Sequence, residues 1–268
     1  MVSAPEMEGN QNAAGPSKAE IMAVALSHHL NDGELVIMGA YSMIPMLASR
    51  MAQLTHAPNL NYIAGGSGAV NPRLEPLVHS SCDVRNLKAE CVLPLPTVID
   101  FEGKTEIDLF FAGGLQIDKY GNCNLVGIGE YSAMKLRGPG TVGLPFLARA
   151  RRFAIYTQGH DPRTFIEKVD FISGPGFFQG ENYNEMNIPS NGPALVVTPI
   201  AVMDFHEKTH QMRLKSTYPG VTPEQVQEQT GFELLIPSSV PESEMPTDTE
   251  LEIMQRLDPQ GIARNSIR

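Results

Sequence analysis

A short stretch that ends at residue 124 carries the residues best suited to chemistry. Apolar residues 107–111 lead into Gly113 and Gly114, and polar side chains follow at close spacing: Gln116, Asp118, Asn122 and Asn124. Glycine has no Cβ, so the amides of paired glycines can approach a ligand closely. These neutral donors suit a thioester carbonyl, or the oxyanion formed from it, better than a phosphate. We predict a catalytic carbonyl site at Gly113, Gly114 and Gln116; a tight turn with a solvated glutamine is the alternative.

The aspartate and the two asparagines of this stretch allow two interpretations. Asn122 and Asn124 can bind a substrate through their amides, and Asp118 can act as a general base. Short polar side chains also hydrogen-bond to nearby backbone amides, so the same residues can brace the turn at residues 120–122. We assign Asn122 and Asn124 to the substrate site and expect Asp118 to brace the turn.

A second glycine-rich turn, Gly65-Gly66-Ser67-Gly68, follows the apolar residues 60–64. We predict that Gly65 and Gly66 line the substrate site. Ser67 is a candidate catalytic nucleophile, but no His–Asp pair or lysine that could activate it is evident in the sequence. The alternative is that Ser67 only completes the turn.

A third glycine-rich segment consists of Gly138, Gly140 and Gly143. We predict that it contacts the substrate; the alternative is that it only reverses the chain. It does not match the G-x-G-x-x-G pattern that follows a strand in dinucleotide-binding proteins, so a nucleotide cofactor is disfavoured.

The elements that hold these turns alternate between helix and strand. Ser17, followed by Glu20, predicts a capping box and a helix that ends at residues 31–33. This alternation predicts an α/β fold with a mostly parallel sheet flanked by helices, in which the carboxyl ends of the strands usually bind the ligand. Strands are predicted at residues 34–38, 60–64, 107–111, 153–157, 169–172, 195–198 and 201–205, and further helices at residues 44–54 and after Thr222 and Thr247.

Composition narrows the class of protein. The 268 residues, 42% of them hydrophobic, suffice for one large domain, which we expect at residues 17–268 after a flexible tail at residues 1–16. A net charge of −10 disfavours nucleic acid as a partner. No apolar run approaches the ~20 residues that span a bilayer, so no membrane contact is expected. The three scattered cysteines fit a reducing cytoplasm, where we expect the protein to act.

Two histidine-containing segments are the alternatives for a metal site. His28 and His29 are adjacent, so on a helix they point about 100° apart and cannot easily share one ion. His206, Glu207 and His210 lie in a polar turn that we expect to join two strands. We predict no metal site and no tightly bound cofactor.

Four separated motifs occur along the chain in a fixed order. They are Gln116-Ile-Asp-Lys-Tyr-Gly-Asn-Cys-Asn124, Arg137-Gly-Pro-Gly-Thr-Val-Gly143, Val169-Asp-Phe-Ile-Ser-Gly-Pro-Gly176 and Tyr218-Pro-Gly-Val-Thr-Pro-Glu-Gln-Val226. They resemble the motifs of class I coenzyme A transferase β subunits, of the glutaconate CoA-transferase type, over residues 17–259. The resemblance implies the class I CoA-transferase fold, an acyl-CoA substrate that contains coenzyme A, and a homologous α subunit in an αβ or (αβ)₂ assembly.

One position departs from this family. In its transferases a glutamate of the β subunit follows the strand at residues 60–64, attacks the acyl-CoA and carries CoA as a glutamyl thioester. The aligned residue here is Gly65, or Gly66 if the gap moves by one, and neither has a nucleophile. Relatives that also lack the glutamate include the β subunits of steroid-ring-cleaving CoA hydrolases and of a 3-methylglutaconyl-CoA decarboxylase-like pair. Residues 246–259 resemble the hydrolase subunit.

This resemblance implies hydrolytic C–C cleavage of a cyclic CoA ester in steroid-ring degradation. The residues themselves support only a neutral, glycine-lined carbonyl site without a local nucleophile; the substrate comes from the resemblance alone. Two alternatives stay open: a CoA-transferase β subunit acting on a dicarboxylate such as glutaconate, and a non-catalytic scaffold subunit that completes the site of its partner.

Overall fold

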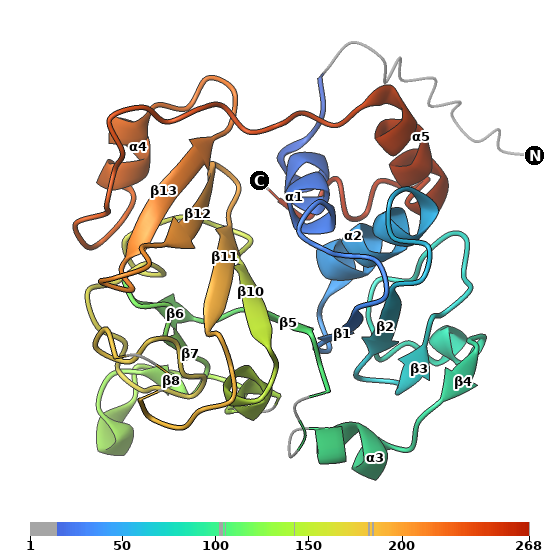
Figure 1. Cartoon of the computed structure of the whole chain (residues 1–268), viewed down its shortest axis with the longest axis horizontal. Helices are drawn as coiled ribbons and strands as arrows, with labels where there is room; N and C mark the ends of the chain where they lie inside the picture. The colour runs from blue at the N-terminus through green and yellow to red at the C-terminus, as the bar shows by residue number, and fades with distance from the viewer. Residues whose placement is uncertain are drawn as a thin grey trace, which may run out of the picture.

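The centre of the molecule is a single large sheet. The computed structural model describes residues 15–101, 104, 106–141, 143–181, 183 and 185–267. In this part of the chain nine strands form a sheet in the order β13-β12-β11-β10-β5-β1-β2-β3-β4 (Figure 1). The five central strands, from β11 to β2, are parallel, and antiparallel strands extend the sheet at both edges. The predicted α/β fold is confirmed.

The strands and helices have the following bounds. The central strands are β1 Leu35–Met38, β2 Asn61–Ala64, β5 Leu109–Ala112, β10 Arg152–Tyr156 and β11 Pro193–Val197. The edge strands are β3 Ala69–Val70, β4 Cys91–Val92, β12 Ala201–Phe205 and β13 Met212–Thr217. Two small hairpins pair β6 Gln116–Ile117 with β7 Cys123–Asn124, and β8 Gly127–Ile128 with β9 Leu136–Arg137. The helices are α1 Lys18–Ser27, α2 Met43–Leu54, α3 Leu95–Asp100, α4 Pro223–Glu228 and α5 Asp248–Leu257, with 3₁₀ turns η1 Val84–Leu87, η3 Tyr131–Ala133 and η4 Leu144–Ala148.

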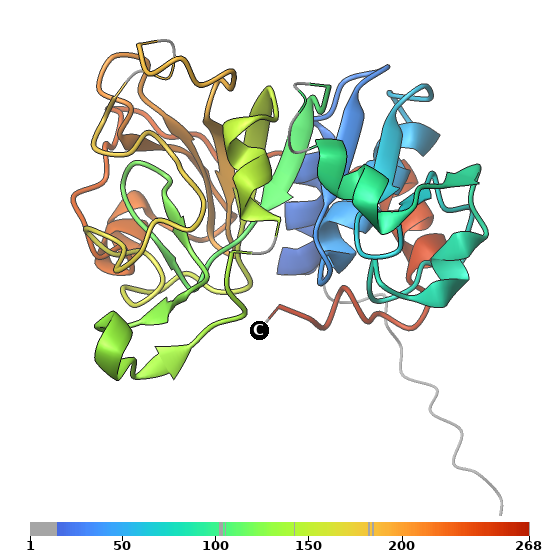
Figure 2. The same ribbon diagram turned by 90° about the horizontal axis from the view of Figure 1, so that it is seen from below.

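Side chains of the central strands alternate between two buried layers. In β1, Val36 and Met38 pack with α1, α2 and α5, whereas Ile37 points into the opposite layer. That opposite layer holds apolar side chains of α3, η4, α4 and the β6–β7 hairpin. Helices α1, α2 and α5 lie together on their side of the sheet in both views (Figures 1 and 2). A parallel sheet covered on both faces needs such near-continuous apolar strands.

Local capping signals place the helix starts. At α1, Ser17 Oγ accepts from Glu20 N at 3.3 Å, while Glu20 Oε2 accepts from Ser17 N at 2.7 Å. The same reciprocal box begins α4 at Thr222 and α5 at Thr247. All three predicted starts are confirmed because each depends only on residues three positions apart.

Two predictions of secondary structure are wrong. The first helix ends at Ser27 rather than at residues 31–33, because His29 and Leu30 already form tight turn bonds to Leu26 and Ser27. Residues 169–172 are not a strand. Their backbone contacts the β6–β7 hairpin instead, with Asp170 N donating to the side-chain oxygen of Gln116 at 3.1 Å. The expected hairpin at His206–His210 is confirmed, because its turn joins β12 to the antiparallel strand β13, for which no bounds were predicted.

The two edges of the sheet differ in what covers them. Residues 235–243 run along the outer edge of β13, where Thr217 N donates to Pro241 O at 3.1 Å and Ser243 N donates to Thr217 O at 2.8 Å. In Figure 1 this segment then continues across the molecule to α5. At the other edge, β4 is the last strand of the sheet within the described part of the chain. An uncovered edge strand can pair with or dock another chain.

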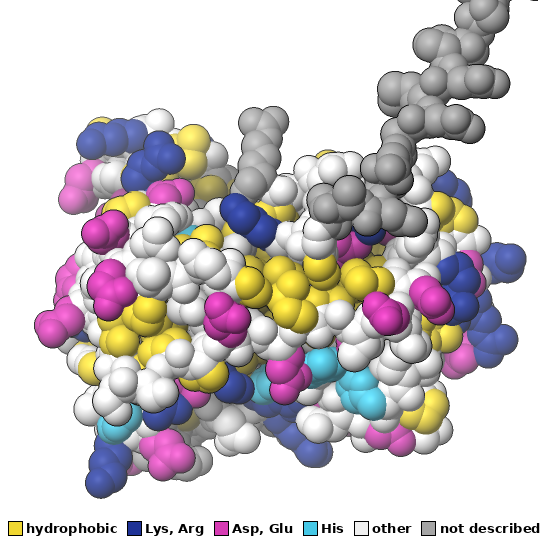
Figure 3. Space-filling model, turned by 90° about the horizontal axis from the view of Figure 1, so that it is seen from above, with side chains coloured by type: hydrophobic (Ala, Val, Ile, Leu, Met, Phe, Trp, Pro, Cys, Tyr) yellow, Lys and Arg dark blue, Asp and Glu magenta, His cyan; other side chains and the backbone are white. Residues whose placement is uncertain are grey.

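The side chains on the surface and the length of the helices are relevant to the partners predicted from the sequence. On the face shown in Figure 3, hydrophobic side chains gather in the middle and charged side chains lie mostly around them. Within the described residues, no helix is both long and apolar enough to cross a membrane. The predicted tail at residues 1–16 lies outside the described residues as far as residue 14.

Candidate functional site

Three neighbouring parallel strands are each followed by a glycine at their carboxyl ends, so the three glycines lie on the same side of the sheet. Gly39 follows β1, Gly65 follows β2 and Gly113 follows β5, with β1 in the middle. Strands in a sheet lie about 5 Å apart, so Gly65 and Gly113 face each other across Gly39 at a distance on the order of 10 Å. We refer to Gly39, Gly65, Gly66, Gly113 and Gly114 as the glycine cluster. It lies at the carboxyl ends of the parallel strands, where ligands usually bind in such sheets.

The amides of Gly113 and Gly114 lie next to each other directly after β5. Among the described residues, neither donates a hydrogen bond to an acceptor of the chain. Beside them, at the carboxyl end of β10, Thr157 Oγ1 is buried and has no hydrogen-bond partner in the same set of residues. Buried polar groups normally have partners, so these donors are suited to an oxygen that a ligand brings.

Gly65 and Gly66 leave no room for a side chain. A Cβ on Gly65 would lie 2.5 Å from the backbone oxygen of Met38. A Cβ on Gly66 would overlap the Sγ of Cys82 and lie 3.0 Å from the Oγ of Ser81. Met38 O also accepts from Gly65 N at 3.1 Å, so it is fixed by the sheet. A carboxylate side chain at either position therefore requires β1 or the segment at residues 81–82 to move.

The fold brings residues 80–82 beside the cluster, although no sequence motif indicates them. Ser81 Oγ accepts from Gly66 N at 3.3 Å and donates to Gly39 O at 2.6 Å. Ser80 Oγ donates to Ala40 O at 2.9 Å. The segment thus connects the ends of β1 and β2 and fixes the spacing of the cluster. Only the tertiary fold makes this contact, so no local signal could have revealed it.

Gln116 lies in a buried hydrogen-bond network rather than in an open site. Its Oε1 accepts from Asn124 Nδ2 at 2.6 Å and from Asp170 N at 3.1 Å, and its Nε2 donates to Asp170 Oδ2 at 3.1 Å. Only 4% of its surface is exposed. These contacts do not support the predicted role of Gln116 as a carbonyl donor; they make it a brace between the β6–β7 hairpin and the loop at Asp170.

Asn122 and Asn124 are also held inside the chain. Both are fully buried, so neither can contact a substrate in this structure. Asn122 Nδ2 donates to both carboxylate oxygens of Asp118, at 3.0 and 2.8 Å, and Asn122 Oδ1 accepts from Gly176 N at 2.9 Å. Asp118 in turn accepts from Tyr120 N at 3.0 Å, as expected for a residue that braces this turn. Burial raises the pKa of Asp118, although its hydrogen bonds act in the opposite direction.

The remaining predicted residues have structural contacts. Ser67 Oγ donates to Ala64 O at 3.2 Å, as a turn residue does, and Gly68 completes the turn with a φ of 71°. Gly138 packs directly against the backbone oxygen of Leu125. Gly140 has a φ of 95° and open space beside it, and Gly143 has a φ of 77° at the start of η4. The structure does not bring these last three residues into the glycine cluster by any contact among the described residues.

Comparison with known protein families identifies the family of this chain. The family model described as Coenzyme A transferase matches residues 19–229. The chain belongs to the coenzyme A transferase family. It is 31% identical to the B subunit of the 3-oxoadipate CoA-transferase of Pseudomonas knackmussii, over 92% of this chain and 95% of the relative. It is 32% identical to the B subunit of the glutaconate CoA-transferase of Acidaminococcus fermentans, over 90% and 92%.

Solved structures agree with this assignment. The glutaconate coenzyme A-transferase of Acidaminococcus fermentans superposes with a TM-score of 0.83 at 29% identity, covering 93% of this chain and 97% of the other. A second group of relatives has a different activity: the cholesterol ring-cleaving hydrolase IpdB subunit of Mycobacterium tuberculosis is 26% identical over 94% of this chain and 99% of the relative. These relatives are subunits of enzymes, and their activities differ.

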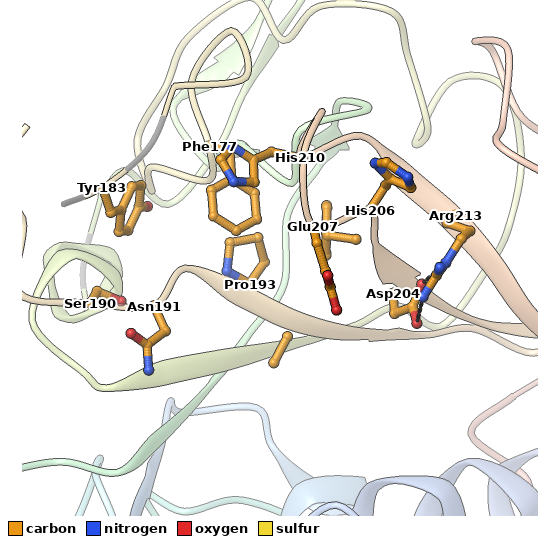
Figure 4. A pocket seen from close by; sticks show the side chains of 12 residues that line it. Phe177, Tyr183, Ser190, Asn191, Pro193, Asp204, His206, Glu207, His210 and Arg213 are labelled. Atoms are coloured by element: carbon orange, nitrogen blue, oxygen red, sulfur yellow. Dashed lines mark hydrogen bonds and ion pairs between the residues drawn. The ribbon is translucent and has the colours of Figure 1, made fainter. Parts of the chain in front are cut away.

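The chain also has a cavity of about 480 Å³ at the other end of the strands, away from the glycine cluster. It lies near the start of β11 and the turn between β12 and β13. Phe177 stacks on His210 there, with ring centroids 4.4 Å apart (Figure 4). Its arginine, Arg213, forms two hydrogen bonds with Asp204, at 2.8 and 2.7 Å. Because that guanidinium is already paired, the described residues that line the cavity offer no free arginine to the phosphates of coenzyme A.

Two of the histidines have partners within the chain. No cluster of at least three histidine, cysteine or acidic side chains in the described part of the chain is arranged to hold an ion. His28 contacts Glu250 at 2.7 Å and Glu244 at 3.1 Å, which attaches the end of α1 to α5 and to the segment before it. His160 lies between Thr198 and Thr230, with both contacts at 3.0 Å. Burial lowers the pKa of His160 to about 4, so it is neutral near pH 7.

Proposed function

We propose that this chain is the β subunit of a heteromeric enzyme that hydrolyses a C–C bond of a cyclic CoA ester, as in steroid-ring degradation. One observation carries the proposal: Gly65 and Gly66 stand where the family's transferases are expected to carry a glutamate, and neither position has space for a side chain. An enzyme without that carboxylate lacks the usual carrier of CoA between two acids. Coenzyme A enters as part of the substrate, with no tightly bound cofactor.

The proposed reaction uses the free amides of the glycine cluster. Hydroxide, formed when a base removes a proton from water, adds to a ring ketone of the substrate. The bond between that carbon and the carbon next to the thioester carbonyl then breaks, and its electron pair moves onto the thioester oxygen as an enolate. The amides of Gly113 and Gly114 stabilise this oxyanion, and a proton returned to carbon completes the addition of one water.

The base in this scheme comes from the α subunit. Within the described residues, the side chains that contact the ends of β1 and β2 include the hydroxyls of Ser80 and Ser81 and the thiol of Cys82, and the hydroxyl of Thr157 lies at the end of β10; none of these four is a carboxylate or a histidine. Hydroxyl groups are poor bases near neutral pH without an activating partner. The relatives' names, which describe subunits, support a partner for this chain.

A specific observation favours a second candidate, a CoA-transferase. The two relatives above 30% identity are both transferase subunits, whereas the hydrolase subunits are 26–27% identical. For this candidate the carrier of CoA must be a group other than residues 65 or 66 of this chain.

A product analysis separates the two candidates. The chain, co-produced with its α subunit, is incubated with a panel of cyclic keto-acyl-CoA esters, with and without acetate. The proposal predicts a product that gains the mass of one water and keeps its CoA, at the same rate in both samples. Formation of acetyl-CoA that depends on acetate, together with the free acid, contradicts the hydrolase and establishes the transferase.

A further inference from the structure

The cavity near the start of β11 has an aromatic wall. Phe177 is the centre of this wall, because its ring stacks on His210 with the centroids 4.4 Å apart. The rings of Tyr183 and Phe205 each lie 5.6 Å from that of Phe177. Gly192 makes room for the wall, since a Cβ there would lie 2.6 Å from the Phe177 ring. The rings are thus packed against one another and against the backbone, and the cavity is formed before a ligand arrives.

The charged groups of this cavity carry an excess of negative charge. Asp204 and Glu207 supply two carboxylates, whereas Arg213 supplies one guanidinium, which is already bonded to Asp204. The pKa of Arg213 is raised, first by that hydrogen bond and to a smaller extent by the charge of Glu207. In Figure 4 the Glu207 side chain points toward the space between Pro193 and Asp204. No hydrogen bond or ion pair within the described residues holds this carboxylate, so it can pair with a cation from outside the chain.

His210 adds a hydrogen-bond acceptor to the same cavity. Its Nδ1 lies 3.0 Å from Gly180 O. A carbonyl oxygen only accepts, so Nδ1 carries the proton, and Nε2 of the neutral ring keeps a lone pair. Within the described residues, no donor is bonded to this Nε2. The cavity therefore offers a carboxylate and an imidazole nitrogen, both of which accept, next to the aromatic wall.

We propose that this cavity binds a small organic amine in its protonated form. The ammonium group pairs with Glu207 and donates to Nε2 of His210. The apolar body of the amine packs on the aromatic wall, whose ring faces also attract the cation. A cavity of about 480 Å³ has the size of small-molecule sites. It lies away from the glycine cluster, so this site does not depend on the proposed function.

Three probes of similar shape but different charge test the proposal: 2-phenylethylamine, 2-phenylethanol and phenylacetate. Their binding to the full chain is measured by isothermal titration calorimetry. We expect the amine to bind with a Kd below about 1 mM. The alcohol should bind at least about tenfold more weakly, because it has no charge for Glu207 or for the rings. Phenylacetate should bind more weakly still, since the excess of carboxylates repels an anion.

Glu207→Gln tests the carboxylate, because it removes the charge and keeps the shape of an exposed side chain. We expect the variant to bind the amine about fivefold more weakly, as for the loss of an exposed ion pair. Its affinity for the alcohol should change less than about twofold, since the alcohol makes no ion pair. Glu228→Gln is the matched control, because Glu228 is an exposed carboxylate on α4, outside the cavity; it should bind all three probes like the unmodified chain.

Several outcomes overturn the proposal. Absence of binding by the amine, equal affinities for the amine and the alcohol, or tighter binding of phenylacetate contradict recognition of a cation. An unchanged Kd of the amine in Glu207→Gln places its binding elsewhere. The titration is repeated on the complex with the α subunit, and loss of binding there shows that the partner fills the cavity, which also contradicts a small-molecule site. Because binding is measured without turnover, CoA transfer to acetate contradicts the proposed hydrolysis without changing this result.

Discussion

The glycine cluster and the β6–β7 hairpin look alike in sequence but differ in structure. Both follow apolar strands and both are rich in amide groups. In the hairpin, Asn122 and Asn124 have their amides bonded inside the chain and are fully buried. In the cluster, the amides of Gly113 and Gly114 have no acceptor among the described residues. The conspicuous polar side chains thus hold the scaffold together, and under the proposed function the backbone amides of the cluster supply the chemistry.

The largest loss of stability is expected from a substitution in the β6–β7 hairpin. Asn122→Ala removes the Nδ2 group that donates to the buried carboxylate of Asp118 and leaves the amide of Gly176 without its acceptor. We expect the free energy of unfolding to fall by about 3–5 kcal/mol, because each buried group left unpaired costs about 1–3 kcal/mol. Urea unfolding measures this loss. Gln255→Ala, which removes an exposed amide from α5, is the control; a similar small loss in both variants would contradict the scaffold role.

Acid should also destabilise the protein, through two largely buried histidines. Burial lowers the pKa of His160, and burial together with the charge of Arg152 lowers that of His29, each to about 4. In the unfolded chain a histidine has a pKa near 6.5. Their contribution to stability is therefore complete above pH 6.5 and is lost as the pH falls toward 4, by about 2 kcal/mol for each histidine at pH 5.

Urea midpoints at pH 7.5 and pH 5 measure how much stability changes with pH. His160→Gln does not titrate, so its stability should change less between the two pH values than that of the unmodified chain. An identical change in stability between the two pH values in both proteins would show that His160 does not cause the loss of stability in acid.

The cluster should respond to added volume rather than to lost hydrogen bonds. Gly65→Ala places a methyl group 2.5 Å from Met38 O, so we expect β1 or the turn to shift. The cost is about 1–3 kcal/mol of stability, as for other overpacked sites, together with at least a tenfold lower kcat. Gly159→Ala is the matched control, because nothing lies within 4 Å of the added methyl group. Full activity of Gly65→Ala would mean that the cluster is not tightly constrained.

Gln116→Ala gives the smallest effect on catalysis and the sharpest comparison. Its amide binds Asn124 and Asp170, so the variant should lose about 1–3 kcal/mol of stability. With the substrate bound by backbone amides, kcat should fall less than about tenfold. A loss of about 10²–10³ in kcat, measured under conditions where the variant is folded, would restore Gln116 as an oxyanion donor.

Local features of this fold are easier to predict from the sequence than distant ones. The capping boxes at Ser17, Thr222 and Thr247 each need only four consecutive residues, and all three are present. The predicted strand at residues 169–172 is wrong because the partner of its backbone, Gln116, lies more than fifty residues away. An apolar run shows that a segment is buried, but it does not show which neighbour its amides will bond.

The candidate site follows the same rule. Gly65 and Gly113 were predictable, because glycine after an apolar strand is a local signal. The contact of Ser81 with Gly66 and Gly39 was not, since it joins three separate segments. Asn122 and Asn124 were assigned to the substrate because a sequence cannot distinguish an amide that faces a ligand from one that faces its own chain.

The central claim is that this chain carries no nucleophile at the end of β2. Intact-mass spectrometry of the chain, taken from the complex during turnover with an acyl-CoA and without acceptor, tests the claim directly. The account predicts an unmodified mass and no inactivation by borohydride, since no glutamyl thioester exists to be reduced. A covalent CoA adduct that maps to residues 60–72 would contradict it.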